Sequence, residues 1–144
     1  MNTKKKLADL LGAISIVSKH LAENLPEEED TLPMIYVASP LAGDIEGNIK
    51  RAYEHCRYVV ANQAIPFAPH AFFSGFLNDD IKEERSIGMF LGREALKKCS
   101  ALWAFCDNGE PSQGMKEEIA LANELGIPVR YFRKGHQLCT DIMD

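Results

Sequence analysis

The stretch ALWAFCDNGEPSQGMKEEIALA, residues 101–122, decides the fold class, because it joins a buried strand, a polar loop and a helix. Ala101–Phe105 is an unbroken apolar run, typical of a strand that is covered on both faces, and Asp107 follows it closely. Ser112 is a favoured N-cap residue, and apolar side chains recur at helical spacing after it. A strand that leads through a loop into a helix is the repeating unit of parallel α/β sheets.

Glu118 is a carboxylate on the apolar side of that helix, whereas its neighbour Glu117 points to the solvated side. The apolar stripe around Glu118 consists of Met115, Ile119, Leu121, Ala122 and Leu125. Two interpretations are open: a rim residue paired with Lys or Arg, or a nucleophile or proton carrier whose pKa is shifted by partial burial. The turn at Ser112 and Gly114 favours the second, because hydroxyl and amide groups at a helix start bind anions or sugars.

The rest of the chain body alternates strands and helices in the same way. Strands are predicted over residues 34–38, from Ile65 and from Ile127, and helices over residues 48–62, 81–98 and 112–125. Residues 70–80 are expected to form a short helix or an ordered lid. The expected inward side chains are Ile49, Ala52, Tyr53, Cys56 and Val59 or Val60 in the first helix, and Ile87, Phe90, Leu91 and Leu96 in the second. This pattern predicts an α/β fold with a three-layer, mainly parallel, flavodoxin- or Rossmann-like sheet and helices on both faces.

The N-terminal residues 1–33 are predicted to be an appendage to an α/β domain over residues 34–144. Leucines at helical spacing predict an amphipathic helix over residues 4–25, and residues 26–33 form an acidic linker bounded by prolines. The polar face of this helix mixes acids with lysines and lacks aromatic anchors. Packing on the body or on another subunit is therefore favoured over packing on a membrane surface.

Composition and charge narrow the possible partners. A chain of 144 residues with 46% hydrophobic residues is long enough for one domain with its own core, and its net charge of −5 argues against nucleic-acid and anionic-membrane binding. The four cysteines have neither CxxC spacing nor histidines at metal-ligand intervals, so reduced thiols and no metal or cofactor are expected. No secretory signal or long apolar run is present, which predicts a cytoplasmic protein.

Ligands of parallel sheets bind beyond the carboxyl ends of the strands. This rule places three segments around one site: the loop 39–43, the residues after Pro66, and the loop 107–114. His70 is open to either a role in binding or a hydrogen bond within its loop. Trp103 is expected in the core, and His136 carries no usable signal.

Two motifs resemble those of the nucleoside 2-deoxyribosyltransferase-like superfamily, including its 2'-deoxynucleoside 5'-monophosphate N-glycosidase branch. Tyr36 to Pro40, YVASP, resembles the Y-x-A-[GS]-P loop that follows the first strand of the family. Ser112 and Gly114 resemble the S-x-G loop, and Glu118 lies four residues after the glycine, as does the family's catalytic glutamate. The resemblance spans residues 35–132, looks closest to a bacterial and phage subgroup, and excludes the N-terminal helix.

The resemblance implies a metal-free N-glycosidase or deoxyribosyltransferase that forms a covalent glycosyl intermediate on Glu118. The substrate would be a nucleoside, nucleotide or related ribosyl compound. The residues implied to bind it are Tyr36, Ser39, Pro40, Leu41, Gly43, His70, Asp107, Ser112, Gly114 and Met115. A homodimer or higher homo-oligomer is also implied, because sites in the family are commonly completed by a neighbouring subunit.

The sequence departs from the family pattern at two positions. Gly92 stands where the family carries an aspartate that assists the leaving base, and Asp79, Asp80 and Asp107 are candidate substitutes. Ala42 stands where the first loop of the family carries a phosphate-binding arginine. The first departure leaves a second hypothesis open, a non-catalytic module that binds a nucleotide or nucleotide-derived signal. The second favours neutral nucleosides over monophosphates.

Overall fold

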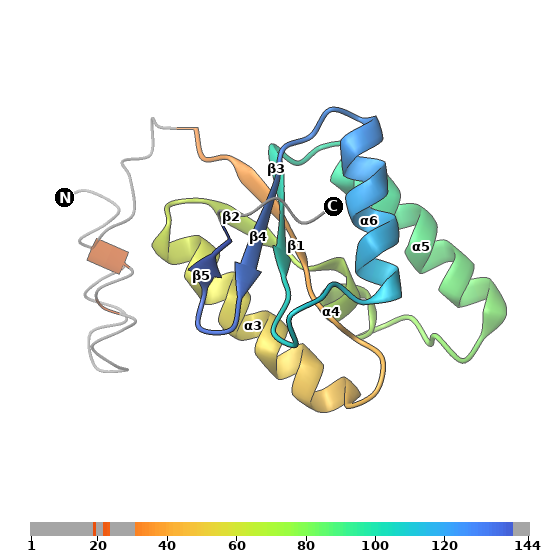
Figure 1. Cartoon of the computed structure of the whole chain (residues 1–144). Helices are drawn as coiled ribbons and strands as arrows, with labels where there is room; N and C mark the ends of the chain where they lie inside the picture. Colours follow the sequence, from red (N-terminus) through yellow and green to blue (C-terminus); the bar gives the residue numbers. More distant parts are fainter. Residues whose placement is uncertain (1–18, 20–21, 24–30, 140–144) are drawn as a thin grey trace.

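The protein is described by a computed structural model that covers Lys19, Ala22, Glu23 and residues 31–139 (Figure 1). Its five-stranded sheet has the order β2-β1-β3-β4-β5, in which only β5 runs antiparallel to its neighbour. The strands are β1 (Met34–Ala38), β2 (Ile65–Phe67), β3 (Ala101–Phe105), β4 (Val129–Arg133) and β5 (Gln137–Leu138). The predicted α/β class with a mainly parallel sheet is confirmed. The helix predicted over residues 4–25 lies almost entirely outside the described residues, and the domain boundary at residue 33 stays a prediction.

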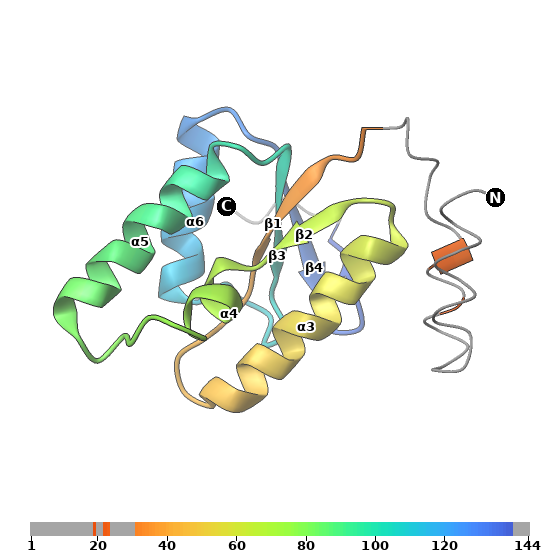
Figure 2. The same cartoon turned by 180° about the vertical axis from the view of Figure 1, so that it is seen from behind.

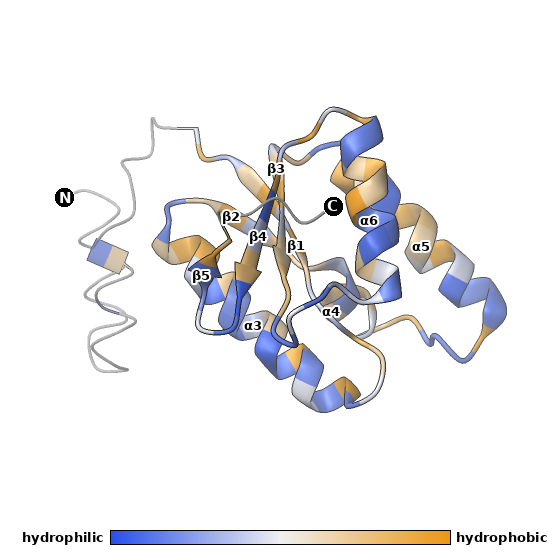
Figure 3. Ribbon diagram, in the orientation of Figure 1, coloured by the Kyte–Doolittle hydropathy of each residue, from blue (hydrophilic) through white to orange (hydrophobic). Residues whose placement is uncertain are grey.

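Helices cover both faces of this sheet, as predicted. They are α3 (Ile45–Ala61), α4 (Pro69–Phe73), α5 (Lys82–Leu96) and α6 (Gln113–Glu124). In Figure 1, α3 lies on one face, and α5 and α6 lie on the other. Figure 2 shows α4 between α3 and α5, close to the end of β2. Hydrophilic and hydrophobic residues alternate along α3, α5 and α6, as expected for helices with one face on a sheet and one in water (Figure 3).

The central strands are apolar on both sides because both faces are covered. Residues that face α3 include Ile35, Val37, Trp103 and Phe105, and residues that face α5 and α6 include Tyr36, Ala38, Leu102 and Ala104. Trp103 is a core residue as predicted. The two-residue alternation also fixes the face on which a polar residue near a strand end emerges.

The predicted inner face of α3 is partly wrong. Tyr53 is 57% exposed, and the buried residues are Asn48, Ala52, His55 and Val59. The helix also begins at Ile45, three residues before the predicted start, because the Asp44 carboxylate caps it by accepting the Gly47 N–H at 3.1 Å. The face that meets the sheet therefore carries two polar side chains in place of the expected aromatic one.

The predicted inner face of α5 is wrong for three of its four residues. Ile87, Phe90 and Leu91 are exposed, and the buried residues of this helix are Gly92 and Leu96. The N-terminal half of α5 extends beyond the edge of the sheet, so only the C-terminal half has a core to pack against (Figure 1).

The four cysteines all lie among the described residues. All four cysteines are free, and Cys99 and Cys106 are buried. Within the described part of the chain, no helix combines the length and apolar character needed to cross a membrane.

Candidate active site

Each of the four parallel strands is followed by a polar side chain at the carboxyl end of the sheet. Ser39 follows β1, His70 lies in α4 after β2, Asp107 follows β3, and His136 follows β4. We call this region the carboxyl edge. It is the position where α/β sheets bind ligands, and the predicted site loops meet here.

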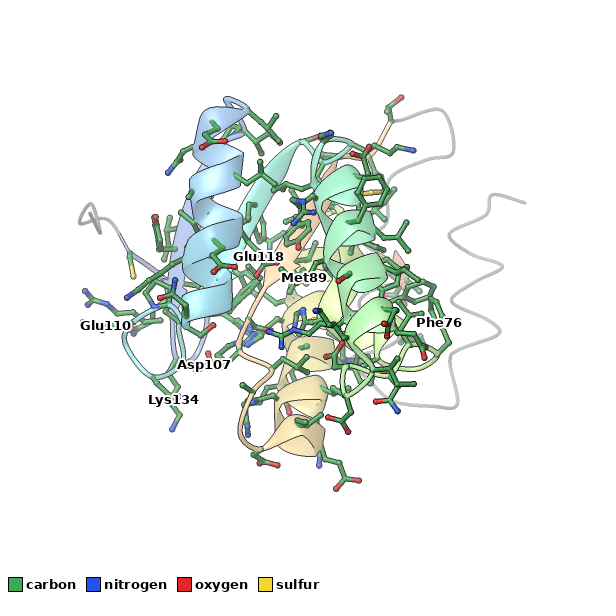
Figure 4. All side chains as sticks on the ribbon, turned by 90° about the vertical axis from the view of Figure 1, so that its right-hand side faces the viewer. Phe76, Met89, Asp107, Glu110, Glu118 and Lys134 are labelled. Carbon is green, nitrogen blue, oxygen red and sulfur yellow. The ribbon has the colours of Figure 1, made fainter. Side chains whose placement is uncertain are left out.

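Glu118 and Tyr36 form the hydrogen bond at the centre of the candidate site. The Tyr36 hydroxyl, from the middle of β1, donates to the Glu118 carboxylate on α6. The alternation of β1 sends Tyr36 to the α6 face, and helical spacing turns Glu118 toward the sheet (Figure 4). The two residues were predicted separately as site residues, and the structure brings them together.

Partial burial changes the acidity of this pair. Burial raises the pKa of Glu118 to about 7, the hydrogen bond from Tyr36 opposes that rise, and the charge of Glu117 adds to it. Burial is also the main cause that raises the pKa of Tyr36 above its ordinary value, with the Glu118 charge second. Tyr36 therefore remains a hydroxyl donor at neutral pH. Glu118, in contrast, changes its protonation state close to neutral pH.

The first of the two interpretations of Glu118, a rim carboxylate paired with Lys or Arg, is not supported by the geometry. Among the described residues, no Lys or Arg forms an ion pair with Glu118, and its hydrogen-bond partner is Tyr36. Glu117, one residue earlier, is exposed as predicted. A half-buried carboxylate without a cation is costly, which is typical of functional sites.

The start of α6 has the predicted N-cap. The Ser112 hydroxyl accepts the Met115 N–H at 3.3 Å, and Gly114 is exposed in the first turn. Met115 has only 1% exposure and packs in the core. It therefore has the least exposed side chain of the predicted binding residues, and its role in binding stays a prediction.

The first loop is held by a residue that the sequence did not single out. The Asn48 side chain donates to the carbonyl oxygens of Leu41 and Ala42, both at 3.0 Å, and accepts from Arg51 at 2.8 Å. Gly43 adopts a φ of 94°, a conformation that favours glycine. Arg51 also lies 3.6 Å from Asp44, so a guanidinium stands beside this loop although Ala42 offers none. Asn48 was detectable as a polar residue in phase with Ala52 on the inner face of α3.

Ser39 and His70 meet at the ends of β1 and β2. The Ser39 Oγ and His70 Nε2 atoms lie 2.8 Å apart, and Ser39 is buried. Burial lowers the pKa of His70 to about 4, with a smaller contribution from His55, so the ring is neutral at physiological pH. The hydrogen bond within the strand-end loops is present, and contact of His70 with a substrate stays a prediction.

Gly92 lies beside the central hydrogen bond. A Cβ atom at this position would stand 3.6 Å from the Tyr36 hydroxyl and 4.0 Å from the Pro69 Cβ. The position where the family pattern has an aspartate is therefore next to the partner of Glu118, but no carboxylate is there. Met89, one turn earlier, is 48% exposed and lies on the side of α5 that faces α6 in Figure 4.

Asp107, His55 and His136 form a hydrogen-bonded cluster on the α3 side. His55 Nε2 lies 3.0 Å from Asp107 Oδ2, and His55 Nδ1 lies 2.8 Å from His136 Nε2. Asp107 was predicted, but His55 and His136 were missed. His55 could have been found, because it lies three residues after Ala52 and four before Val59. His136 depends on the β4–β5 turn, which the sequence pattern did not show.

Among the described residues, the remaining candidate carboxylates form no hydrogen bond with Tyr36 or Glu118. Asp79 and Asp80 are exposed in the connection between α4 and α5. Within the described residues, no group of three or more His, Cys, Asp or Glu side chains is placed to hold a metal ion.

Residues 33–132 match the family described as a domain of unknown function, DUF7768. The chain belongs to this family. No curated protein matches the chain. The DUF7768 region contains all the residues of the site except His136.

Two of the solved structures that resemble this DUF7768 protein are 2-deoxyribosyltransferases. One is the 2-deoxyribosyltransferase of Bacillus psychrosaccharolyticus, with a TM-score of 0.61, 18% identity and 77% of each chain covered. Another is the 2-deoxyribosyltransferase of Leishmania mexicana, with a TM-score of 0.53, 15% identity, and coverage of 78% of this chain and 88% of that one. The fold is therefore nucleoside 2-deoxyribosyltransferase-like, as the sequence resemblance predicted.

Proposed function

We propose that this protein is an enzyme that cleaves or transfers the N-glycosidic bond of a nucleoside, nucleotide or related ribosyl compound, without a metal. The observation that carries the proposal is Glu118 itself, a partly buried carboxylate that is held by Tyr36 and forms no ion pair with a described Lys or Arg residue. The deoxyribosyltransferase-like fold supports it.

The chemistry assigns the nucleophile to Glu118. Its carboxylate oxygen would form a bond to the anomeric carbon while the bond from that carbon to the base nitrogen breaks. The base leaves with the electron pair and takes up a proton. Water or a second base then displaces Glu118 from the glycosyl ester, giving hydrolysis or transfer. Tyr36 would hold the carboxylate in line during both steps.

The test is base release by matched glutamate variants. Purified protein is incubated with the 2'-deoxynucleosides, their 5'-monophosphates and NAD, and free base is measured by chromatography. Glu118→Ala should abolish release, and Glu117→Ala, its exposed neighbour, should retain it. Equal activity of both variants on a substrate that the native chain cleaves would refute the assignment.

A second candidate function is a binding module that uses the same site without turnover. It is favoured by Gly92, which supplies no carboxylic acid of its own, in addition to Glu118, to protonate a leaving base. Saturable binding of an intact nucleoside or nucleotide by calorimetry, with no base released, would support this function over the enzyme.

Neutral nucleosides are the preferred substrates in this proposal. No basic residue comes from the first loop itself, and the nearby Arg51 is already engaged by Asp44 and Asn48. A 5'-monophosphate that binds at least about tenfold more tightly than its nucleoside would contradict the preference. Loss of that advantage in Arg51→Gln would assign the phosphate to Arg51.

A homo-oligomer and a cytoplasmic location complete the proposal. The exposed apolar residues on α4 and α5 support an oligomer, since an apolar surface of this kind is usually covered. The cytoplasmic location rests on the sequence-based expectation alone.

A further inference from the structure

The cluster of Asp107, His55 and His136 joins three separate elements at the carboxyl edge. Asp107 follows β3, His55 comes from the middle of α3, and His136 lies in the turn between β4 and β5. Nitrogen and oxygen atoms connect them in one line, at 3.0 Å and 2.8 Å. The proposed reaction at Glu118 does not use the two histidines, although one of them is almost fully buried.

The two imidazole rings are held in place by aromatic stacking. The His55 ring stacks on Phe105 with centroids 4.2 Å apart and 9° between the planes. The His136 ring stacks on Tyr58 at 4.3 Å and 14°, and its backbone adopts a φ of 59°. Each ring thus has one stacked aromatic neighbour in addition to its hydrogen bond, and these contacts together favour one geometry for the line.

The direction of the hydrogen bonds follows from the acceptor at one end. Burial lowers the pKa of both histidines, so both rings are neutral and each carries one N–H. The Asp107 carboxylate can only accept, so His55 donates from Nε2 and its Nδ1 must accept from His136 Nε2. Both rings are then fixed as Nε2–H tautomers.

This arrangement leaves one oxygen of Asp107 available. Oδ2 accepts from His55, and no described residue donates to Oδ1. The side chain keeps 19% exposure, so it reaches solvent at the carboxyl edge. Figure 4 shows Asp107 on the same side of the molecule as Glu118 and nearer to α3. The charge of His55 also contributes, after burial, to lowering the pKa of His70.

We propose that His55 is a positioning residue that orients Asp107 to accept a hydrogen bond from an O–H or N–H group of the nucleoside, and that His136 fixes the ring of His55. The inference rests on the proposed function and deepens it, because it assigns the polar contact on the α3 side of the site. A carboxylate held by an inner hydrogen bond loses less freedom when it binds a substrate than a free one. The line thus prepares Asp107 before the substrate arrives.

The first test reads the tautomers without any substrate. Long-range ¹H–¹⁵N correlation spectra of the full chain at pH 8 should show both His55 and His136 protonated at Nε2 and not at Nδ1. Asp107→Asn should broaden or shift the His55 signals, whereas Tyr58→Phe, which keeps the stacked ring, should preserve both tautomers. A His55 ring protonated at Nδ1 in the native chain would overturn the proposal.

The second test measures binding of the four 2'-deoxynucleosides by calorimetry in the Glu118→Ala background, where turnover is prevented. His55→Phe keeps an aromatic ring and removes the donor, and it should weaken binding about tenfold. His55→Gln keeps an N–H donor and should recover most of the affinity. His136→Phe leaves His55 in place and should give an intermediate loss. Circular dichroism spectra and unfolding temperatures of all variants establish that they are folded.

Combined variants distinguish positioning from simple loss of packing. If His55 acts through Asp107, adding His55→Phe to Asp107→Ala should cost little further affinity, because the two residues act as a unit. Fully additive losses, or an undiminished affinity in His55→Phe, would overturn the proposal. Absence of base release by the native chain would refute only the proposed enzymatic function. The positioning role of His55 would still be tested, because binding is measured separately. Absence of binding of every deoxynucleoside would refute the positioning role.

Discussion

Glu118 is the residue for which function and stability conflict most directly. A carboxyl group whose pKa is raised from 4.5 to about 7 binds more protons in the folded chain than in the unfolded chain between those pH values. Ionisation of Glu118 therefore lowers the free energy of unfolding as the pH rises through this window. The partly buried His70 acts in the opposite direction, because its neutral form is favoured and stability rises from about pH 4 to 6.5.

A neutral isostere should remove the cost of the Glu118 charge. Glu118→Gln is expected to be more stable than the native chain at pH 8, by up to about 3 kcal/mol, and close to it at pH 4.5. Urea unfolding at both pH values measures the difference. Exposed Glu117→Gln is the matched control and should change stability little at either pH. A Glu118→Gln variant that is less stable at pH 8 would contradict the assigned burial of this charge.

Tyr36 should set the pH at which Glu118 becomes a nucleophile. Its hydrogen bond stabilises the carboxylate, so Tyr36→Phe raises the pKa of Glu118 further. The rising limb of kcat/KM against pH, expected near pH 7 for the native chain, should move to higher pH in the variant. A profile with an unchanged limb and a uniform loss of rate would show that Tyr36 does not tune Glu118.

At the scale of elements, α5 has an exposed N-terminal half and two glycines that lie against neighbouring residues. These are Gly88, beside Leu77, and Gly92, beside Tyr36. A Cβ at Gly92 would meet the Tyr36 hydroxyl at 3.6 Å, and a Cβ at Gly88 would meet Leu77 at 3.5 Å, both ordinary contact distances. Alanine is thus tolerated at either position. Only the methyl group at position 92 would enter the space beside Glu118 and Tyr36.

The two glycine variants should therefore separate stability from function. Gly92→Ala and Gly88→Ala are each expected to stabilise the helix by about 0.5–1 kcal/mol. Base release should fall in Gly92→Ala and stay unchanged in Gly88→Ala. Thermal unfolding and base-release assays on both variants check this. Equal activity of the two would show that Gly92 leaves no space that the substrate uses.

The helix faces show which parts of the fold could be predicted from sequence. The alternation of strands and helices identified the sheet. The stripe around Glu118 was correct for Met115, Ile119 and Ala122, which are buried, but not for Leu125, which is 42% exposed at the end of the helix. The faces of α3 and α5 were misjudged because large apolar residues were assumed to lie inside. Tyr53 and Phe90 are exposed, while His55 and Gly92 are buried. The faces of α3 and α5 that pack on the sheet consist largely of small and polar residues, and a hydropathy pattern does not identify such residues as buried.

The contacts of the site needed the three-dimensional structure. Tyr36 and Glu118 were each predicted, but they are far apart in sequence and only the sheet register and the position of α6 join them. His136 could not be assigned, because the short strand β5 and its turn carry no pattern of their own. Motifs at strand ends were therefore predictable, whereas hydrogen bonds between elements were not.

At the scale of the whole molecule, α4, α5 and the connection between them expose a group of apolar side chains that we call the aromatic face. It consists of Phe72, Phe76, Ile87, Phe90 and Leu91. Phe72 and Phe76 are each 60% exposed and contact one another edge to face. Figure 4 shows Phe76 projecting beside α5. A second copy of this chain is the partner expected from the sequence resemblance.

A charge on the aromatic face should dissociate the oligomer. The native chain is expected to sediment as a dimer or larger species at micromolar concentration, and Phe90→Glu as a monomer, because burying an unpaired carboxylate at an interface is costly. Tyr53→Glu, at an equally exposed aromatic position on α3, is the control and should leave the assembly intact. A native chain that sediments as a compact monomer would contradict the predicted oligomer.

The central claim, that Glu118 is a nucleophile, is tested most directly by trapping its covalent intermediate. The native chain is mixed with the 2'-deoxynucleoside that it cleaves, quenched in acid within milliseconds to seconds, digested and examined by peptide mass spectrometry. The account predicts that the peptide containing Glu118 gains the mass of one deoxyribosyl group, that fragmentation places this group on Glu118, and that Glu118→Gln shows no gain. A deoxyribosyl group on another residue, or rapid base release by Glu118→Gln, would contradict it.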